Sequence, residues 1–223
     1  MKKILLATIC CLAALTACTI DSYEKGDGEY SNVQGDFALL HANSAKMIDY
    51  VELDNGERLN LKEPMAKQWV NKADTFYRSV LFYKKNGDLI EVVNAVQVSE
   101  MNILSADTLK KRKIEVKTDP LKLESVWVSK NKQYMNASIY LKTGSTTDET
   151  AIHLLGLVAD SLYRNADNSI VLCLRLLHDQ GGMPEYYSVN TYFSLPLRSL
   201  PVDSIRLTVN TYEGEVTKSL SIR

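Results

Sequence analysis

Short runs of alternating apolar and polar residues fill most of the chain after residue 35, and such alternation is typical of strands with one buried face. In the first half these runs cover 36–41, 47–53, 58–61, 76–85 and 89–98. Asp54-Asn55-Gly56 and Asn86-Gly87-Asp88 lie between neighbouring runs, and Asn-Gly is a strong hairpin signal. Residues 64–71 (PMAKQWVN) predict one or two helical turns, because proline suits the start of a helix. Five strands with a small helix before the fourth predict an OB-like Greek-key barrel over residues 35–106.

Alternation is clearer in the second half. Seven runs have one apolar face: 123–128, 135–141, 152–158, 170–176, 187–195, 205–209 and 216–222. Glu213-Gly214 separates the last two and predicts a terminal hairpin. About seven strands in a hundred residues favour an antiparallel, immunoglobulin-like β-sandwich over residues 120–223. The polar stretch before Asp119-Pro120 predicts a linker over residues 107–119, since proline favours an extended break. The expected fold class is therefore all-β, a barrel followed by a sandwich.

The first residues resemble a bacterial export signal. Met1-Lys2-Lys3 is followed by an apolar stretch over residues 4–14, which is too short to span a bilayer. It ends in Leu15-Thr16-Ala17-Cys18, which resembles the lipobox of bacterial lipoproteins at all four positions. We therefore expect a signal peptide over residues 1–17 and a lipid on Cys18, against the alternative of an ordinary signal peptide with a chance cysteine. Two or three acyl chains would hold the protein on a membrane permanently.

A polar, acidic and glycine-containing segment follows the lipobox and predicts a flexible tether over residues 18–34. Without the signal peptide the chain would have 223 − 17 = 206 residues, and 24 basic against 27 acidic side chains give a charge of −3. This ordinary surface argues against a nucleic-acid partner, which usually requires a basic face. The basic run Lys110-Lys111-Arg112-Lys113 is more simply a solvated connector.

The order of these parts resembles the NigD-like lipoproteins of Bacteroidetes. The resemblance is carried by residues 119–128 (DPLKLESVWV), 209–215 (VNTYEGE) and 51–59 (VELDNGERL). It implies the same barrel and sandwich, a place in the cell envelope and most simply on the outer membrane, and no catalytic residues. It also implies at most an immunity or accessory role towards a bacteriocin. Trp69 and the basic connector differ from the commoner family pattern, which leaves the subfamily open.

The cysteines predict no disulfide in the mature chain. Cys10 and Cys11 would leave with the signal peptide and Cys18 would carry the lipid, so Cys173 alone would remain free. Cys173 lies in the apolar run 170–174, which favours a small buried hydrophobic residue over a reactive thiol.

The polar residues predict neither a cofactor nor a metal. His41, His153 and His178 lie in three different expected elements, without the spacing of a zinc site. Nucleophile-elbow, phosphate-loop and dinucleotide motifs are missing from the sequence. The acidic pairs Asp148-Glu149 and Glu213/Glu215 could in principle serve glycan hydrolysis or calcium binding, but turns attract such residues for local hydrogen bonding. We therefore expect a protein that is not an enzyme.

Tyrosine supplies the best binding signal, with twelve tyrosines against four phenylalanines. Tyr186, Tyr187 and Tyr192 follow the loop at 179–184 and are candidate ligand contacts, because tyrosine suits both sugar stacking and protein interfaces. The alternative is that they are ordinary strand residues. The leading hypothesis is a non-enzymatic envelope protein that binds an unknown protein or glycan. Bacteriocin immunity and surface glycan binding are the two other hypotheses.

Overall fold

A computed structural model describes residues 31–113 and 115–223. The predicted signal peptide, Cys18 and most of the predicted tether lie outside the described residues. Residues 34–223 form one compact unit, which contains all the elements described below. Within the described ranges, no helix has the length and apolar character needed to cross a membrane.

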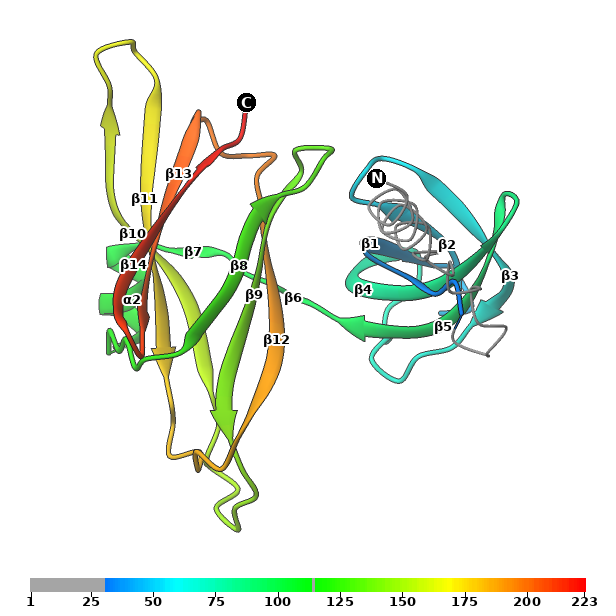
Figure 1. Ribbon diagram of the computed structural model, residues 1–223, viewed down its shortest axis with the longest axis horizontal. Coiled ribbons are helices and arrows are strands. Elements are labelled where there is room, and N and C mark those ends of the chain that lie inside the picture. The colour runs from blue at the N-terminus through cyan, green and yellow to red at the C-terminus, as the bar shows by residue number, and fades with distance from the viewer. Residues whose placement is uncertain (1–30, 114) are drawn as a thin grey trace, which may run out of the picture. The chain divides into compact units, whose positions relative to one another are not determined.

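The first strands close into a five-stranded barrel, as the sequence predicted. They are β1 (Gln34–Ala42), β2 (Ile48–Leu53), β3 (Arg58–Met65), β4 (Thr75–Asn86) and β5 (Leu89–Gln97). Their order around the barrel is β1-β2-β3-β5-β4, and β4 pairs with β1 to complete it (Figure 1). Alternate residues such as Leu40, Val51 and Leu81 are fully buried inside. The predicted OB-like barrel is confirmed.

The predicted helix over residues 64–71 is wrong. Strand β3 continues to Met65, which pairs with Ile48 of β2, and a turn follows in which the Val70 amide donates to the Lys67 carbonyl. Pro64 is tolerated because it lies near the end of a strand, where a missing amide donor costs little. Val70 and Trp69 pack against the barrel core, so tertiary burial of these two side chains decides the local conformation.

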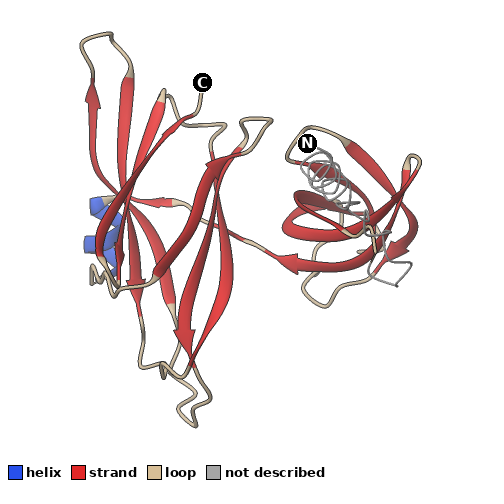
Figure 2. Ribbon diagram, in the orientation of Figure 1, coloured by secondary structure: helices blue, strands red, loops and turns tan. Residues whose placement is uncertain are grey.

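All seven predicted strands of the second half are present. They are β8 (Lys122–Val128), β9 (Tyr134–Thr143), β10 (Leu154–Arg164), β11 (Ile170–Asp179), β12 (Tyr187–Pro196), β13 (Ser204–Thr211) and β14 (Gly214–Ser221). Together with two short strands, β6 (Ser99–Glu100) and β7 (Ile103–Leu104), they form two sheets, ordered β14-β13-β11-β10-β7 and β6-β12-β9-β8. Figure 2 shows that strands dominate the described chain. Inward side chains of both sheets, among them Leu174, Phe193 and Leu207, make one apolar core. The predicted sandwich is confirmed.

Three of the strand pairs in the sandwich are parallel, although the sequence predicted antiparallel sheets. Strand β11 pairs in parallel with β13, and two short strands, β6 (Ser99–Glu100) and β7 (Ile103–Leu104), pair in parallel with β12 and β10. Residues 99–104, which we placed in the barrel domain, thus hydrogen-bond to both sheets of the sandwich. The domain limits 35–106 and 120–223 stay predictions.

The predicted linker contains a short helix, α2 (Ala106–Arg112). The Ser105 side chain accepts a hydrogen bond from the Thr108 amide and so caps its first turn. Lys113 ends the helix in the left-handed conformation. Farther along, Cys173 is free but only partly buried, because it points to the outer face of β11 while Leu172 and Leu174 enter the core. The prediction that its side chain is buried is therefore only partly met.

Candidate functional site

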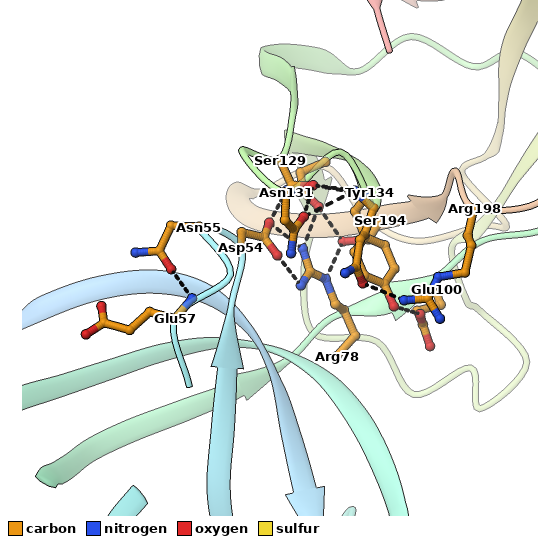
Figure 3. A network of polar contacts seen from close by, with 12 residues as sticks. Asp54, Asn55, Glu57, Arg78, Glu100, Ser129, Asn131, Tyr134, Ser194 and Arg198 are labelled. Atoms are coloured by element: carbon orange, nitrogen blue, oxygen red, sulfur yellow. Dashed lines mark hydrogen bonds and ion pairs between the residues drawn. The ribbon is translucent and has the colours of Figure 1, made fainter. Parts of the chain in front are cut away.

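A buried polar cluster joins the barrel to the sandwich, and we call it the polar junction (Figure 3). Its centre is Arg78 of β4, which is 2% exposed. The guanidinium donates to both carboxylate oxygens of Asp54, at 2.6 and 2.7 Å. It also donates to Asn136 of β9 at 2.9 Å and to Ser194 of β12 at 3.1 Å. The barrel and the sandwich are therefore held together by charge-assisted bonds, which are about twice as strong as neutral ones.

The partners of Arg78 are also bonded to each other. Asn136 donates to Asp54 at 2.7 Å, and the Ser194 hydroxyl donates to Asn136 at 2.7 Å. The backbone amide of Asn131 donates to the backbone carbonyl of Asp54 at 2.8 Å. Every polar group around the buried charge has a hydrogen-bond partner. These bonds offset the cost of removing the ion pair from water.

The turn Asp54-Asn55-Gly56 builds one side of this junction. The Asn55 side chain accepts from the Glu57 amide at 2.8 Å, and Gly56 takes a φ of 91°. Sequence analysis found this turn as a hairpin signal but missed that Asp54 binds Arg78. The available signal was Arg78 itself, a charged residue in the apolar run 76–85.

Aromatic rings surround the junction. Phe37 makes edge contacts with Trp127, at 5.2 Å between centroids, and with Tyr192, at 5.5 Å. The Arg78 guanidinium lies 4.0 Å from the centre of the Tyr134 ring. Burial raises the pKa of Tyr134 to about 12, and the neighbouring Glu100 carboxylate, which accepts its hydroxyl hydrogen, adds to this effect. Tyr134 therefore stays a neutral donor.

A cleft of about 270 Å³ lies beside the junction, lined in part by Asp36, Asp54 and Trp127. Both carboxylates already accept hydrogen bonds, Asp36 from Tyr83 and Asp54 from Arg78. Their engagement favours a structural role over acid–base chemistry.

The three tyrosines predicted to contact a ligand lie in two different places. Tyr192 packs against Phe37 at the junction. Tyr186 is 77% exposed and Tyr187 is 55% exposed, at the start of β12. The Tyr186 ring lies over Gly144, where a Cβ would come within 2.6 Å of it. The structure thus separates Tyr192 from the two exposed tyrosines, and ligand contact by any of them stays a prediction.

Charged side chains accompany the exposed tyrosines. Lys142 bonds to Glu185 at 3.0 Å, and its ammonium lies 4.3 Å from the centre of the Tyr212 ring. Tyr212 is itself 44% exposed. Aromatic rings and paired charges at one end of a sandwich make a surface suited to a polar ligand with apolar faces.

One member of each acidic pair considered for catalysis is engaged locally. Asp148 accepts from the amide and the hydroxyl of Thr150, and these bonds hold the pKa of its carboxyl below the usual range. Glu215 pairs with Arg175. In the described part of the chain, no group of three or more His, Cys, Asp or Glu is arranged to hold a metal ion.

Two of the three histidines lie together. His153 Nδ1 is 3.1 Å from His178 Nε2, and the rings are nearly parallel with centroids 5.4 Å apart. His41 lies on the barrel, where its Nδ1 is 2.8 Å from Asp49. Sequence analysis did not pair His153 with His178, because the two residues meet only through the pairing of β10 with β11.

The histidine pair predicts a loss of stability in mild acid. Burial, followed by the charge of His178, lowers the pKa of His153 below its usual value of 6.5. Because the native pKa is lowered, the stability that neutral His153 contributes is fully present above pH 6.5 and is lost as the pH drops through the native pKa. We expect the free energy of unfolding, measured with urea between pH 7.5 and 5, to fall with pH. In His153→Gln this fall should be shallower, whereas an unchanged slope would contradict the assignment.

The fold and its junction define a class of protein, namely a small closed barrel joined to a two-sheet sandwich by buried polar contacts. Residues 102–222 match the NigD-like C-terminal beta sandwich domain, a match that covers more than half of the chain. The chain therefore belongs to the NigD-like family, which confirms the resemblance inferred from its residues. No curated protein matches the chain.

Solved structures with the same fold include three from Bacteroides species. A NigD-like immunity protein from Bacteroides caccae is 21% identical, with a TM-score of 0.63 over 86% of this chain and 94% of that one. A protein of unknown function from Bacteroides vulgatus is 18% identical, with a TM-score of 0.61 over 85% and 90%. A candidate lipoprotein from Bacteroides fragilis is 11% identical, with a TM-score of 0.62 over 86% and 98%. These similarities each cover most of the chain.

Proposed function

We propose that this protein is a non-enzymatic lipoprotein of the bacterial cell envelope that acts by binding another molecule, a protein or a glycan. The observation that carries the proposal is the contrast between its polar groups and its aromatic ones. The buried polar side chains of the junction are used in bonds to each other, whereas Tyr186 and Tyr187 are exposed at the end of the sandwich. Exposed large aromatic side chains are the common anchors of binding surfaces.

Binding is tested with the purified mature protein on a glycan array and against envelope proteins immobilised singly. We expect Tyr186→Ala and Tyr187→Ala to weaken binding by about tenfold or more, because aromatic anchors contribute about 1–2 kcal/mol or more. Tyr163→Ala is the matched control, since Tyr163 is 40% exposed but lies on the other hairpin, β10–β11. Hydrolysis of an offered polymer that is abolished by a single carboxylate substitution would instead make the protein an enzyme.

The lipid anchor is supported by the lipobox Leu15-Thr16-Ala17-Cys18 and by the fold shared with the candidate lipoprotein of Bacteroides fragilis. We expect the wild-type protein to fractionate with membranes, most simply the outer membrane, and Cys18→Ala to be released into the soluble fraction. Protease treatment of intact cells then tells which face of the membrane carries the protein. Retention of Cys18→Ala on membranes would refute anchoring through this residue.

Immunity towards a bacteriocin is the second candidate function. It is favoured by the family assignment and by the immunity protein of Bacteroides caccae among the structures with this fold. Deleting the gene should then raise sensitivity to the toxin produced by neighbouring cells, and a plasmid copy should restore resistance. Equal sensitivity with and without the gene would remove this candidate.

A further inference from the structure

Strand β12 has one edge that is almost unpaired. It pairs along its whole length with β9, at one side of the second sheet (Figure 1). On the other edge the short strand β6 covers only Phe193 and Ser194. Among residues 31–113 and 115–223, no further backbone hydrogen bond joins residues 187–192 to another segment. Because alternate residues of a strand direct their amides and carbonyls to opposite edges, every second residue of this segment has these groups free.

The core of the sandwich is open along this edge. Val189 pairs with Leu141 of β9, and directly paired residues share one face of a sheet. Leu141 is buried in the core, whereas Val189 is 43% exposed. Tyr187 lies two residues earlier on the same face and is 55% exposed. A strand added beside residues 187–192 would cover both side chains.

The other long edge strands of the sandwich have features that oppose pairing with a further strand, namely bulges and inward charges. Strands β8 and β10 each contain a bulge, after Leu123 and after Ala159. Strand β14 points Lys218 to the core side, opposite Leu207 of β13. Residues 187–192 (YSVNTY) contain no bulge, charge or proline. Of these four edges, that of β12 is therefore the one open to strand addition.

The charged groups at the two ends of the free edge already have partners. Glu100 of β6 accepts from the Tyr134 hydroxyl at 2.9 Å, and Glu185 pairs with Lys142 at 3.0 Å. A charged side chain buried against this edge would find no counter-ion, and an unpaired buried charge is costly. The edge therefore complements a segment whose buried side chains are uncharged.

A cavity of about 460 Å³ begins at β6, the strand that an added segment would continue. It is lined in part by Ser99 and Glu100 of β6, by Met101 and by residues 153–156 at the start of β10. Leu155 from this lining packs against the core of the sandwich. The cavity is large enough to receive an apolar side chain of the added strand.

We propose that the free edge of β12 binds an extended peptide segment of a partner protein, which adds a strand to the second sheet in line with β6. This inference rests on the proposed function, because it names the kind of partner that the protein binds. Main-chain hydrogen bonds to residues 187–192 supply affinity, and side chains at alternate positions supply specificity. Apolar side chains of the partner cover Tyr187 and Val189. The alternate ones lie beside Ser188 and Asn190 and are polar.

The test begins with selection from a library of random twelve-residue peptides displayed on phage, with the purified mature protein as bait. A selected peptide is then synthesised with a single N-methyl group at each position in turn. N-methylation removes one amide donor, so affinity should fall by about tenfold at every second position and change little at those between. Equal sensitivity at all positions, or failure to select any peptide, overturns the proposal.

Val189→Lys tests the same edge from the side of the protein, because it gives β12 the inward lysine that β14 already has. We expect it to weaken binding of the selected peptide by about tenfold or more. Val93→Lys is the matched control, since Val93 is 40% exposed on β5 of the closed barrel. It should leave binding unchanged, and urea unfolding verifies that both variants are folded. Equal binding by the two variants contradicts strand addition.

Failure of this inference can be told apart from failure of the proposed function. Glycan binding that needs Tyr186 and is unaffected by Val189→Lys removes strand addition and leaves the proposed function intact. A wild-type protein that binds neither peptides, glycans nor envelope proteins contradicts both.

Discussion

Arg78→Met is expected to lower the free energy of unfolding by about 3–5 kcal/mol, because breaking a buried ion pair on one side leaves the other charge without compensation. Asp54, Asn136 and Ser194 would all lose a donor at once. Methionine keeps most of the length and apolar character of the arginine side chain, so the loss measures the polar contacts. Urea unfolding at constant pH, followed by tryptophan fluorescence, gives the difference.

Arg58→Met is the matched control for this experiment. Arg58 lies on the same barrel but is exposed, with its guanidinium 3.5 Å from the centre of the Tyr50 ring. Its loss should cost less than about 1 kcal/mol, as for other exposed cation–π contacts. In the double variant Asp54→Asn/Arg78→Met the cost should fall below the sum of the two single costs. Equal effects of Arg78→Met and Arg58→Met would show that the junction is not an important source of stability.

Gly181→Ala is expected to cost about 3 kcal/mol or more, the sum of left-handed backbone strain and a forced displacement of packed atoms. A Cβ at this position would lie 1.9 Å from the backbone carbonyl oxygen of Ile152, and the residue has a φ of +57°. Because the obstacle is backbone, a side-chain rotation cannot relieve it. The loops 144–153 and 180–186 would have to separate.

Gly182→Ala separates the two contributions. Gly182 has a φ of +75°, but nothing lies within 4 Å of its Cβ position. This variant should therefore lose only the backbone term, about 1–2 kcal/mol. Thermal or urea unfolding of the two variants side by side gives the comparison. If both lose the same stability, the contact between Gly181 and Ile152 is not tight in solution.

The sequence alone determined the two folds of this protein and nearly all of their strands. Alternation of apolar and polar residues places strands reliably, because each strand buries one face against a core. The turn at Asp54-Asn55-Gly56 was equally clear, since glycine supplies a positive φ that other residues avoid. The prediction of a helix over residues 64–71 was wrong for the opposite reason. Its helical pattern is weak, and burial of Trp69 and Val70 against the barrel overrides local preference.

Only the tertiary structure decided which polar residues meet. Asp54 and Asn136 are 82 residues apart and Arg78 and Ser194 are 116 apart, yet all four share one buried cluster. Likewise, His153 and His178 become a pair only when β10 aligns with β11, and Tyr192 is assigned to the junction only by its packing against Phe37. Local sequence patterns encode which face of a strand is buried, because neighbouring residues alternate. They carry no information on which distant strand covers that face, and the polar chemistry of this protein depends on those long-range contacts.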